Sequence, residues 1–249
     1  MSAPLVSLDH VGLVYPIYSI RAQSLRHAAI NLAVGGRMMK GSNDVIHVKA
    51  LNNVSFKLNE GDRLGLVGHN GSGKTTLLKV LAGVYEPSEG VINVRGQVSS
   101  MLDIGHGVDW EATGVDNVKI MSRLRGLRGR EIRARMDDII SFSELGGYAD
   151  LPMKTYSAGM ATRLMFTLAT SFTSDVLILD EWLGAGDAAF LHKVAERMES
   201  VLAQARVLIL ASHNFGLLES TCNKLLVLEK GSVVYFGPKD DLPDALRPV

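Results

Sequence analysis

The sequence has little of several features that mark special classes of protein. It contains one cysteine, Cys222, so no disulfide can form within the chain. Its 26 basic and 26 acidic side chains give a formal net charge of zero, so overall charge points to no nucleic-acid partner. The first residues, Met1 to Leu5, lack the charged start and long apolar stretch of a secretion signal. These absences predict a cytosolic protein.

Long hydrophobic runs are also missing. The apolar run Val207–Ala211 is far shorter than the about 20 residues that a membrane-spanning helix needs, and the others are similar. Any association with a membrane must therefore come through a partner. The 249 residues are 47% hydrophobic, which is enough to bury a sizeable core in one large domain or two small lobes.

A glycine-rich stretch lies between the apolar run Leu64–Val67 and the apolar helix-like segment Thr76–Leu81. It reads Gly68, His69, Asn70, Gly71, Ser72, Gly73, Lys74 and Thr75. Strand, G-x-x-x-x-G-K-T and helix together predict a P-loop, whose glycines let backbone amides surround a phosphate. Lys74 would reach the β- and γ-phosphates, and the Thr75 hydroxyl would bind Mg²⁺. The alternative is a glycine-rich turn without function, which leaves the full motif unexplained.

Two further apolar runs end in polar side chains. Val176–Leu179 leads into Asp180 and Glu181, and Val207–Ala211 leads toward His213. Continuous apolar runs are typical of central parallel strands, and ligands bind at the carboxyl ends of such strands. Asp180 is therefore predicted to hold Mg²⁺, and Glu181 to activate the attacking water. The alternative for Asp180 and Glu181 is an acidic N-cap of the following helix. His213, considered alone, could have a purely structural role.

The N-terminal region predicts strands with one basic insertion. Leu5–Tyr15 alternates as a first strand ending at Pro16, and Tyr15 could stack on a purine or pack in the core. Ile20–Val34 has helical periodicity, and the segment from Ile20 to Lys40 carries basic residues without an acid. It could rest near anionic headgroups or a phosphorylated substrate, or pack as a surface helix.

The remaining segments predict a sheet with a helical insertion. Val45–Val48 and Ala50–Leu58 indicate a second pair of strands, and Val91–Val94 a further strand. Trp110–Gly147 is rich in helix formers and arginines, whose simplest role is a solvated face. Leu225–Gly237 indicates a closing hairpin.

The segment around Ser157 and Gly159 resembles the signature of the ATP-binding cassette family. It reads Tyr156-Ser157-Ala158-Gly159-Met160 and precedes Arg163 and the acidic strand end. The resemblance covers nearly the whole chain. It implies an α/β fold with a P-loop, RecA-like core, an antiparallel β edge subdomain and an inserted α-helical subdomain. The expected division is a core of 1–104 and 165–249 and a helical subdomain of 105–164, with no carbohydrate-binding domain after the cassette.

The family resemblance also implies a site for ATP and Mg²⁺ completed by a second copy. Ser157 and Gly159 of one subunit would cap the ATP on the P-loop of the other. Glu181, His213 and Lys74 would act in hydrolysis, with His213 as the switch histidine. The nucleotide contacts would come from Tyr15, Gly68, His69, Asn70, Gly71, Ser72, Gly73, Lys74, Thr75, Thr76, Ser157, Gly159 and Asp187. The metal would be bound by Thr75, Asp180 and Asp103. Asp103 stands where the family usually has a glutamine, because the nearby Gln97 is too close to the preceding strand.

Two motifs resemble the cell-surface polysaccharide exporters within this family. They are Leu102–Gly107 and Thr113–Asn117, which accompany the basic insertion and the Tyr-Ser-x-Gly-Met signature. The resemblance implies an ATPase subunit at the cytoplasmic face of the inner membrane. Its partners would be a second copy, a membrane permease and a lipid-linked polysaccharide of O-antigen, capsule, teichoic acid or galactan type, but no nucleic acid.

Other functions within the superfamily are the alternatives. One is the ATPase of a different ABC transporter, and the other is a soluble cassette that acts on DNA or ribosomes. The second usually has a tandem cassette or a coiled-coil insertion, whereas this sequence has one P-loop and no sustained heptad pattern. A P-loop kinase or GTPase would leave Ser157–Gly159 unexplained.

Overall fold

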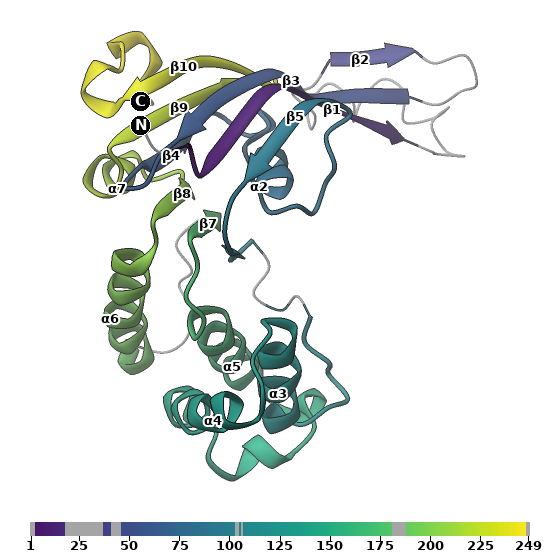
Figure 1. Ribbon diagram of the computed structural model, residues 1–249, viewed down its shortest axis with the longest axis vertical. Coiled ribbons are helices and arrows are strands. Elements are labelled where there is room, and N and C mark those ends of the chain that lie inside the picture. The colour runs from purple at the N-terminus through teal and green to yellow at the C-terminus, as the bar shows by residue number, and fades with distance from the viewer. Residues whose placement is uncertain are drawn as a thin grey trace. The chain divides into compact units, whose positions relative to one another are not determined.

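The computed structural model describes residues 3–17, 37–40, 46–102, 105, 107–180 and 188–247. Its chain divides into two compact units, which are drawn in Figure 1. Unit 1 comprises residues 1–98, 175–182 and 206–249, and unit 2 comprises 99–174 and 183–205. The sequence analysis placed the helical part at 105–164, so unit 2 extends further in both directions along the chain.

An antiparallel sheet forms one part of unit 1. Its strands are β1 (Val6–Ile17), β2 (Arg37–Lys40), β3 (Ile46–Leu58) and β5 (Glu89–Val94), in the order β2-β3-β1-β5. The prediction of two strands between residues 45 and 58 was wrong, since β3 is continuous. Its irregular register with β1 and the positive φ of Asn53, 56°, let one long strand bend. The predicted helical segment at Ile20–Val34 lies outside the described residues.

A six-stranded sheet carries the carboxyl ends that sequence analysis singled out. Its strands are β4 (Arg63–Val67), β6 (Val98–Ser100), β7 (Val176–Asp180), β8 (Val207–Ala211), β9 (Lys224–Glu229) and β10 (Ser232–Pro238), in the order β10-β9-β4-β8-β7-β6. β4 pairs in parallel with β8 and β9, and β7 with β8, while β9 and β10 form the predicted hairpin. β8 is buried along its whole length, which explains its unbroken apolar sequence.

Short helices complete unit 1. They are α2 (Lys74–Leu81), α7 (Phe215–Thr221), and the 3₁₀ turns η3 (Lys239–Asp241) and η4 (Asp244–Leu246). Cys222 follows α7 and is buried, and this burial raises the pKa of its thiol to about 12. The thiol therefore stays protonated and unreactive at neutral pH.

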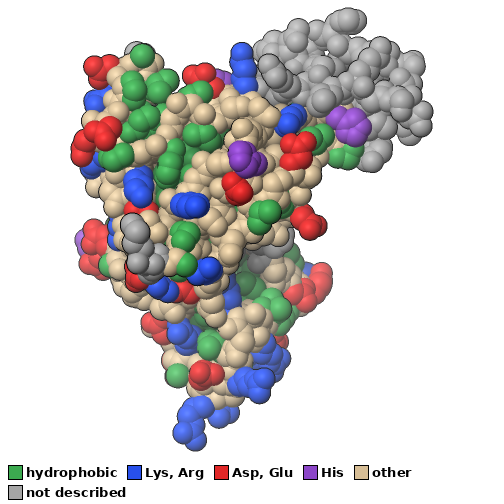
Figure 2. Space-filling model, turned by 45° about the horizontal axis from the view of Figure 1, so that its top comes forward, with side chains coloured by type: hydrophobic (Ala, Val, Ile, Leu, Met, Phe, Trp, Pro, Cys, Tyr) green, Lys and Arg blue, Asp and Glu red, His purple; other side chains and the backbone are tan. Residues whose placement is uncertain are grey.

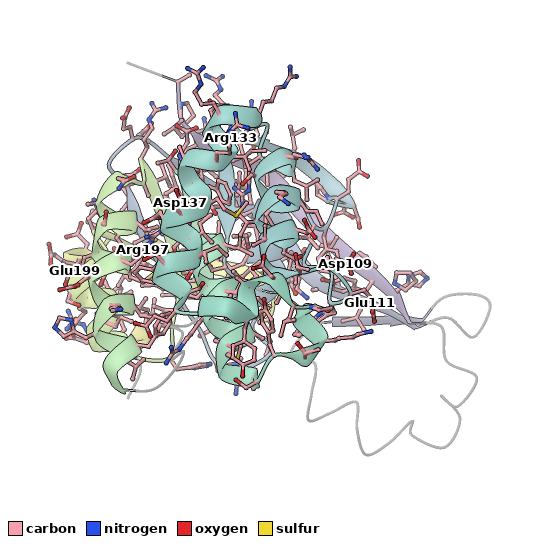
Figure 3. The ribbon with its side chains drawn as sticks, turned by 90° about the horizontal axis from the view of Figure 1, so that it is seen from below. Asp109, Glu111, Arg133, Asp137, Arg197 and Glu199 are labelled. Atoms are coloured by element: carbon pink, nitrogen blue, oxygen red, sulfur yellow. The ribbon has the colours of Figure 1, made fainter. Side chains whose placement is uncertain are left out.

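Unit 2 is helical. Its elements are α3 (Gly114–Leu124), α4 (Gly129–Ser143), η1 (Gly146–Asp150), η2 (Met153–Thr155), α5 (Ala158–Thr170) and α6 (Ala188–Gln204). α6 belongs to this unit because Phe190, 1% exposed, packs edge-on against Phe142 and Phe166 with ring centroids 5.8 and 6.2 Å away. Figure 3 shows Arg197 on α6, whose guanidinium donates to Asp138 of α4 and lies 4.6 Å from the Phe142 ring centroid.

A buried amide fixes the entry into α3. Asn117 is fully buried, and its Nδ2 donates to the carbonyls of Asp109 and Thr113 at 2.8 and 3.0 Å. Its Oδ1 accepts from the Asp109 amide at 2.8 Å. The Thr113 hydroxyl caps the helix by accepting from the Asp116 amide. The motif Thr113–Asn117 therefore has a local structural role, independent of any ligand.

Replacing Asn117 with alanine is expected to lower the free energy of unfolding by about 2–3 kcal/mol. The change removes three hydrogen bonds made by a fully buried side chain and leaves space where that side chain packed. Urea unfolding would measure it. Asn93→Ala is the control, because Asn93 is exposed and should change stability by less than about 0.5 kcal/mol. Equal midpoints for the two variants would contradict the role given to Asn117.

Candidate nucleotide-binding site

The glycine-rich stretch forms a strand, turn and helix, as predicted. β4 ends at Val67 and α2 begins at Lys74. Gly68, Gly71 and Gly73 all have positive φ. A Cβ on Gly68 would lie 2.5 Å from both the Leu228 carbonyl oxygen and the Ser72 Oγ, so this position accepts only glycine without a shift. Because these glycines have no side chains, a ligand can approach the backbone of the turn closely at the start of α2.

The turn of the predicted β9–β10 hairpin supports this loop through a contact that the sequence did not indicate. The Gly231 amide, between β9 and β10, donates to the Ser72 carbonyl at 2.8 Å. The Gly231 carbonyl in turn accepts from the Asn52 amide of β3 at 2.8 Å. A Cβ on Gly231 would lie 2.5 Å from the Ala50 carbonyl oxygen. The dipeptide Lys230-Gly231 was a recognisable turn signal, but only the fold shows that it touches the loop.

The lysine of the loop folds back on the backbone. Its ammonium group donates to the carbonyls of Gly68 and His69, and the residue is only 9% exposed. These carbonyls hold the charge inside the arch of the loop. The side-chain hydroxyl of Ser72 is also buried and forms no hydrogen bond with another described residue. These polar groups suit a bound phosphate. The Lys74 ammonium could exchange its hydrogen bonds to neutral backbone carbonyls for stronger ones to charged phosphate oxygens.

The two predicted metal residues of unit 1 meet in space. Thr75 and Asp180 are 105 positions apart in sequence, yet the Thr75 hydroxyl donates to Asp180 Oδ2 at 3.0 Å. A hydroxyl and a carboxylate are hard oxygen donors that suit Mg²⁺, which needs only one or two protein ligands beside substrate phosphates. Glu181, Asp187 and Asp103 lie outside the described residues. Gln97 precedes β6, and its backbone bonds to Asp175, so it is held at the amino end of that strand.

An aromatic pair lies beside the start of α2. Tyr15 of β1 contacts Tyr85 edge-on, with ring centroids 5.3 Å apart, and Lys79 lies 5.4 Å from the Tyr85 centroid. Burial raises the pKa of Tyr15, and a hydrogen bond with Thr76 opposes that rise. The structure therefore brings together Tyr15 and Thr76, and adds Tyr85, which no sequence motif indicated.

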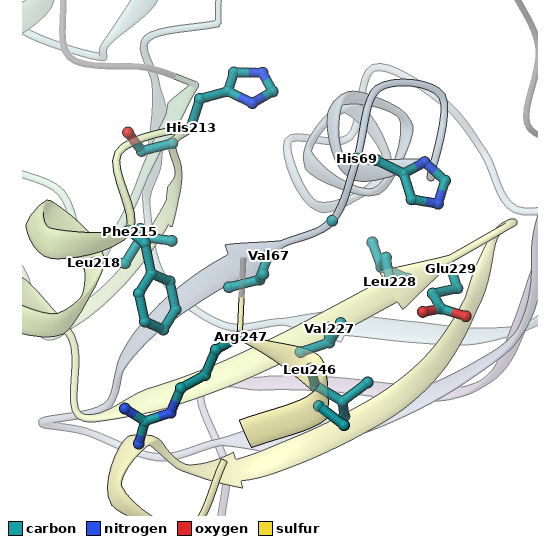
Figure 4. A pocket seen from close by; sticks show the side chains of 13 residues that line it. Val67, His69, His213, Phe215, Leu218, Val227, Leu228, Glu229, Leu246 and Arg247 are labelled. Atoms are coloured by element: carbon teal, nitrogen blue, oxygen red, sulfur yellow. The ribbon is translucent and has the colours of Figure 1, made fainter. Parts of the chain in front are cut away.

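His213 reaches the same cavity as the first loop residues. This cavity of about 390 Å³ is shown in Figure 4. Gly68, His69 and His213 line it together with Glu229 of β9 and Arg247 beyond η4. β4 and β8 are neighbouring parallel strands, so their carboxyl ends place both histidines at one edge of the sheet.

The predicted signature stands at a helix start in unit 2. Ser157 is the N-cap of α5, and its Oγ accepts from the Met160 amide at 3.2 Å. Ser157, Ala158 and Gly159 are all exposed. The open space around Gly159, where a Cβ would meet only the Ser157 Oγ at 4.0 Å, leaves this turn accessible to another molecule.

The family model described as ABC transporter matches residues 51–184. The chain belongs to the ABC transporter family. This match runs from β3 through the P-loop to the segment after β7, and it includes all of α3, α4 and α5. The protein is therefore an ABC ATPase, a nucleotide-binding subunit that hydrolyses ATP.

Relatives of this ABC ATPase include several export proteins. The O-antigen export system ATP-binding protein RfbE of Yersinia enterocolitica is 41% identical over 90% of this chain and 94% of its own length. The O-antigen export system ATP-binding protein RfbB of Klebsiella pneumoniae is 34% identical over 91% of this chain and 90% of its own length. The teichoic acids export ATP-binding protein TagH of Levilactobacillus brevis is 32% identical over 93% of this chain but only 62% of its own.

Two solved structures share the fold of this cassette. An ATP-binding subunit of an ABC transporter superposes with a TM-score of 0.68 at 22% identity, over 95% of this chain and 91% of the other. A dimeric ATP-binding cassette in a post-hydrolysis state with ADP and Pi gives a TM-score of 0.65 at 17% identity. The match covers 94% of this chain and 98% of the other. The predicted α/β fold class with a P-loop core is thereby confirmed.

Proposed function

We propose that this cassette is the ATPase subunit of an exporter that moves lipid-linked cell-surface polysaccharide across the cytoplasmic membrane. The observation that carries the proposal is the similarity to the Yersinia O-antigen export protein, which spans 90% of this chain and 94% of that protein. A second relative of nearly the same extent bears the same description. The similarity thus covers a whole subunit, beyond the family's shared ATPase motifs.

The exporter would need a separate membrane subunit. None of the helices within the described ranges is long and apolar enough to cross a membrane. In this proposal the cassette acts at the cytoplasmic face and couples to a permease, and two copies assemble head to tail. The exposed Ser157 and Gly159 at the start of α5 support that assembly, because a helix N-terminus offers amide donors to the phosphate bound by the other copy.

The site residues take the roles that their positions allow. Lys74 would leave the loop carbonyls and donate to the β- and γ-phosphates, while Thr75 and Asp180 would hold Mg²⁺. The metal would supply charge neutralisation at the transferred phosphate. Glu181 would accept a proton from the attacking water, and His213 would orient toward the γ-phosphate from the cavity edge. Tyr15 would contact the purine. Asp187 would couple the two sites, and Asp103 would substitute for the usual glutamine.

Deleting the gene in its source organism tests the cargo. The expected result is loss of polymer from the cell surface with accumulation of lipid-linked polymer inside, and restoration by the wild-type gene. Normal surface polysaccharide in the deletion strain would contradict the proposed cargo. It would leave the ATPase assignment intact, since that assignment depends on the family alone.

A further inference from the structure

Unit 2 carries a concentration of positive charge around the loop that connects α3 to α4. We name this surface the basic corner, and its members are Lys119, Arg123, Arg128, Arg130 and Arg133. Figure 2 shows several Lys and Arg side chains gathered in its lower part. The basic corner is separate in sequence from the P-loop and from the signature, and no residue of the nucleotide site belongs to it.

A hollow of about 570 Å³ opens between these side chains. Its charged lining consists of Lys119, Arg123, Arg128 and Arg133, and no acidic residue lines it. Its apolar lining includes Leu127 and Ile132. The hollow therefore combines several cationic donors with an apolar wall, a combination that suits an anionic group attached to an apolar one.

The charge of the basic corner is only partly neutralised within the described part of the chain. None of Arg123, Arg128, Arg130 and Arg133 forms an ion pair with another described residue. Lys119 is the exception, because Asp116 accepts from it at 2.9 Å. The Glu131 carboxylate is engaged by the Arg128 backbone amide at 3.1 Å. Arg123 also helps Lys119 to lower the pKa of the Asp116 carboxyl, so the guanidinium groups of Arg128, Arg130 and Arg133 remain available to an external anion.

The backbone holds the basic corner in a defined shape. α3 ends through a bond from the Leu127 amide to the Ser122 carbonyl at 3.0 Å, with Gly126 at a φ of 82°. α4 begins at Gly129, so its first turn carries Arg130 with the positive end of the helix dipole. Figure 3 shows Arg133 near that end of α4 and Asp137 farther along the helix. The charges are therefore presented together by two packed helices.

An exposed leucine decides the class of partner. Leu124, in the last turn of α3, is 71% exposed among the arginines. A large apolar side chain surrounded by cationic groups is typical of surfaces that contact the headgroup region of a membrane, where the apolar group enters and the charges meet phosphates. A purely acidic ligand would pair with the arginines but has no apolar group for Leu124, whereas a phospholipid offers both a phosphate and an apolar chain.

We propose that the basic corner binds the phosphate headgroups of anionic phospholipids, so that unit 2 contacts the membrane surface directly. The arginines and Lys119 would pair with lipid phosphates, and Leu124 would insert between headgroups. The inference depends on the surface of unit 2 alone and is independent of the cargo proposed above. It gives the cassette a membrane contact in addition to the one through a permease.

Flotation of the full chain with vesicles tests this inference. The wild-type protein should float with vesicles of phosphatidylcholine and phosphatidylglycerol in a two-to-one ratio, and should stay in solution with phosphatidylcholine alone. The double variant Arg128→Glu with Arg133→Glu should bind the anionic vesicles at least about 30-fold more weakly, because each basic residue contributes about fivefold. Raising the salt to about 1 M should release the wild type.

A matched control separates the basic corner from overall charge. Lys57→Glu with Arg95→Glu reverses two exposed charges in unit 1 and should bind as the wild type does. Both double variants should retain the wild-type thermal midpoint and basal ATPase rate. Equal weakening in the control, or full binding by the Arg128 and Arg133 variant, would overturn the inference. Vesicle binding that is abolished only by replacing Arg21 and Arg26 would also overturn it. So would an Arg128→Glu, Arg133→Glu variant that still binds anionic vesicles but no longer co-purifies with the membrane subunit.

Discussion

Glu181→Gln is expected to reduce the rate of ATP hydrolysis about 10²- to 10⁴-fold while ATP binding is retained. The proposed role of Glu181 is to accept a proton from the attacking water, and an amide cannot do so. The phosphate contacts of Lys74 and Thr75 are unchanged by the substitution. The variant should therefore accumulate as a closed dimer with ATP bound. Steady-state phosphate release and size-exclusion chromatography with ATP would measure the two effects.

The matched control for this variant is Glu199→Gln. Glu199 is an exposed carboxylate on α6, labelled in Figure 3. Its loss of charge is the same as that at Glu181, but it should leave the hydrolysis rate unchanged. Hydrolysis by Glu181→Gln at the wild-type rate would exclude Glu181 as the base. It would direct attention to other groups near the phosphate, such as His213.

Lys74→Ala is expected to weaken ATP binding about 10- to 100-fold. The ammonium group sits against the Gly68 and His69 carbonyls inside the loop, and a bound phosphate would receive its charged hydrogen bonds. Such bonds contribute about 1.5–3 kcal/mol. Titration with a fluorescent ATP analogue would measure the loss. The control is Lys57→Ala, an exposed lysine on β3 outside the P-loop, which should bind ATP normally.

The two variants should differ in kind. Loss of Lys74 weakens binding of the nucleotide itself, whereas loss of Glu181 affects a step after binding. An unchanged ATP affinity in Lys74→Ala would contradict the reading of residues 68–75 as a phosphate-binding loop. A large loss of affinity in Glu181→Gln would place that side chain among the binding groups.

The P-loop and its neighbours were predictable because local and global signals agree there. Glycine spacing defines the turn, and the apolar runs define buried parallel strands. Because parallel strands align their carboxyl ends, Asp180 was expected opposite Thr75 although 105 positions separate them in sequence, and their side chains are hydrogen bonded. The same reasoning expected His213 just beyond the carboxyl end of a buried strand, and the structure places it in one cavity with His69.

Other features depend on contacts that no local pattern reveals. α6 belongs to the helical unit because Phe190 packs against Phe142 and Phe166, whose positions in sequence give no sign of the pairing. Gly231 supports the P-loop through one backbone bond to Ser72, so its role appears only once β9 and β10 are placed. The single long strand β3 was divided in the prediction near Lys49, and its register with β1 shifts there, between Lys49 and Leu51.

Purification of the tagged chain from its native membrane tests the central claim most directly. An integral membrane protein of the polysaccharide-permease type is expected to come with it in stoichiometric amount, together with a second copy of the cassette. Mass spectrometry of the detergent-solubilised complex would identify both. Recovery of the chain only with DNA or ribosomes, and without any membrane protein, would contradict its assignment to polysaccharide export.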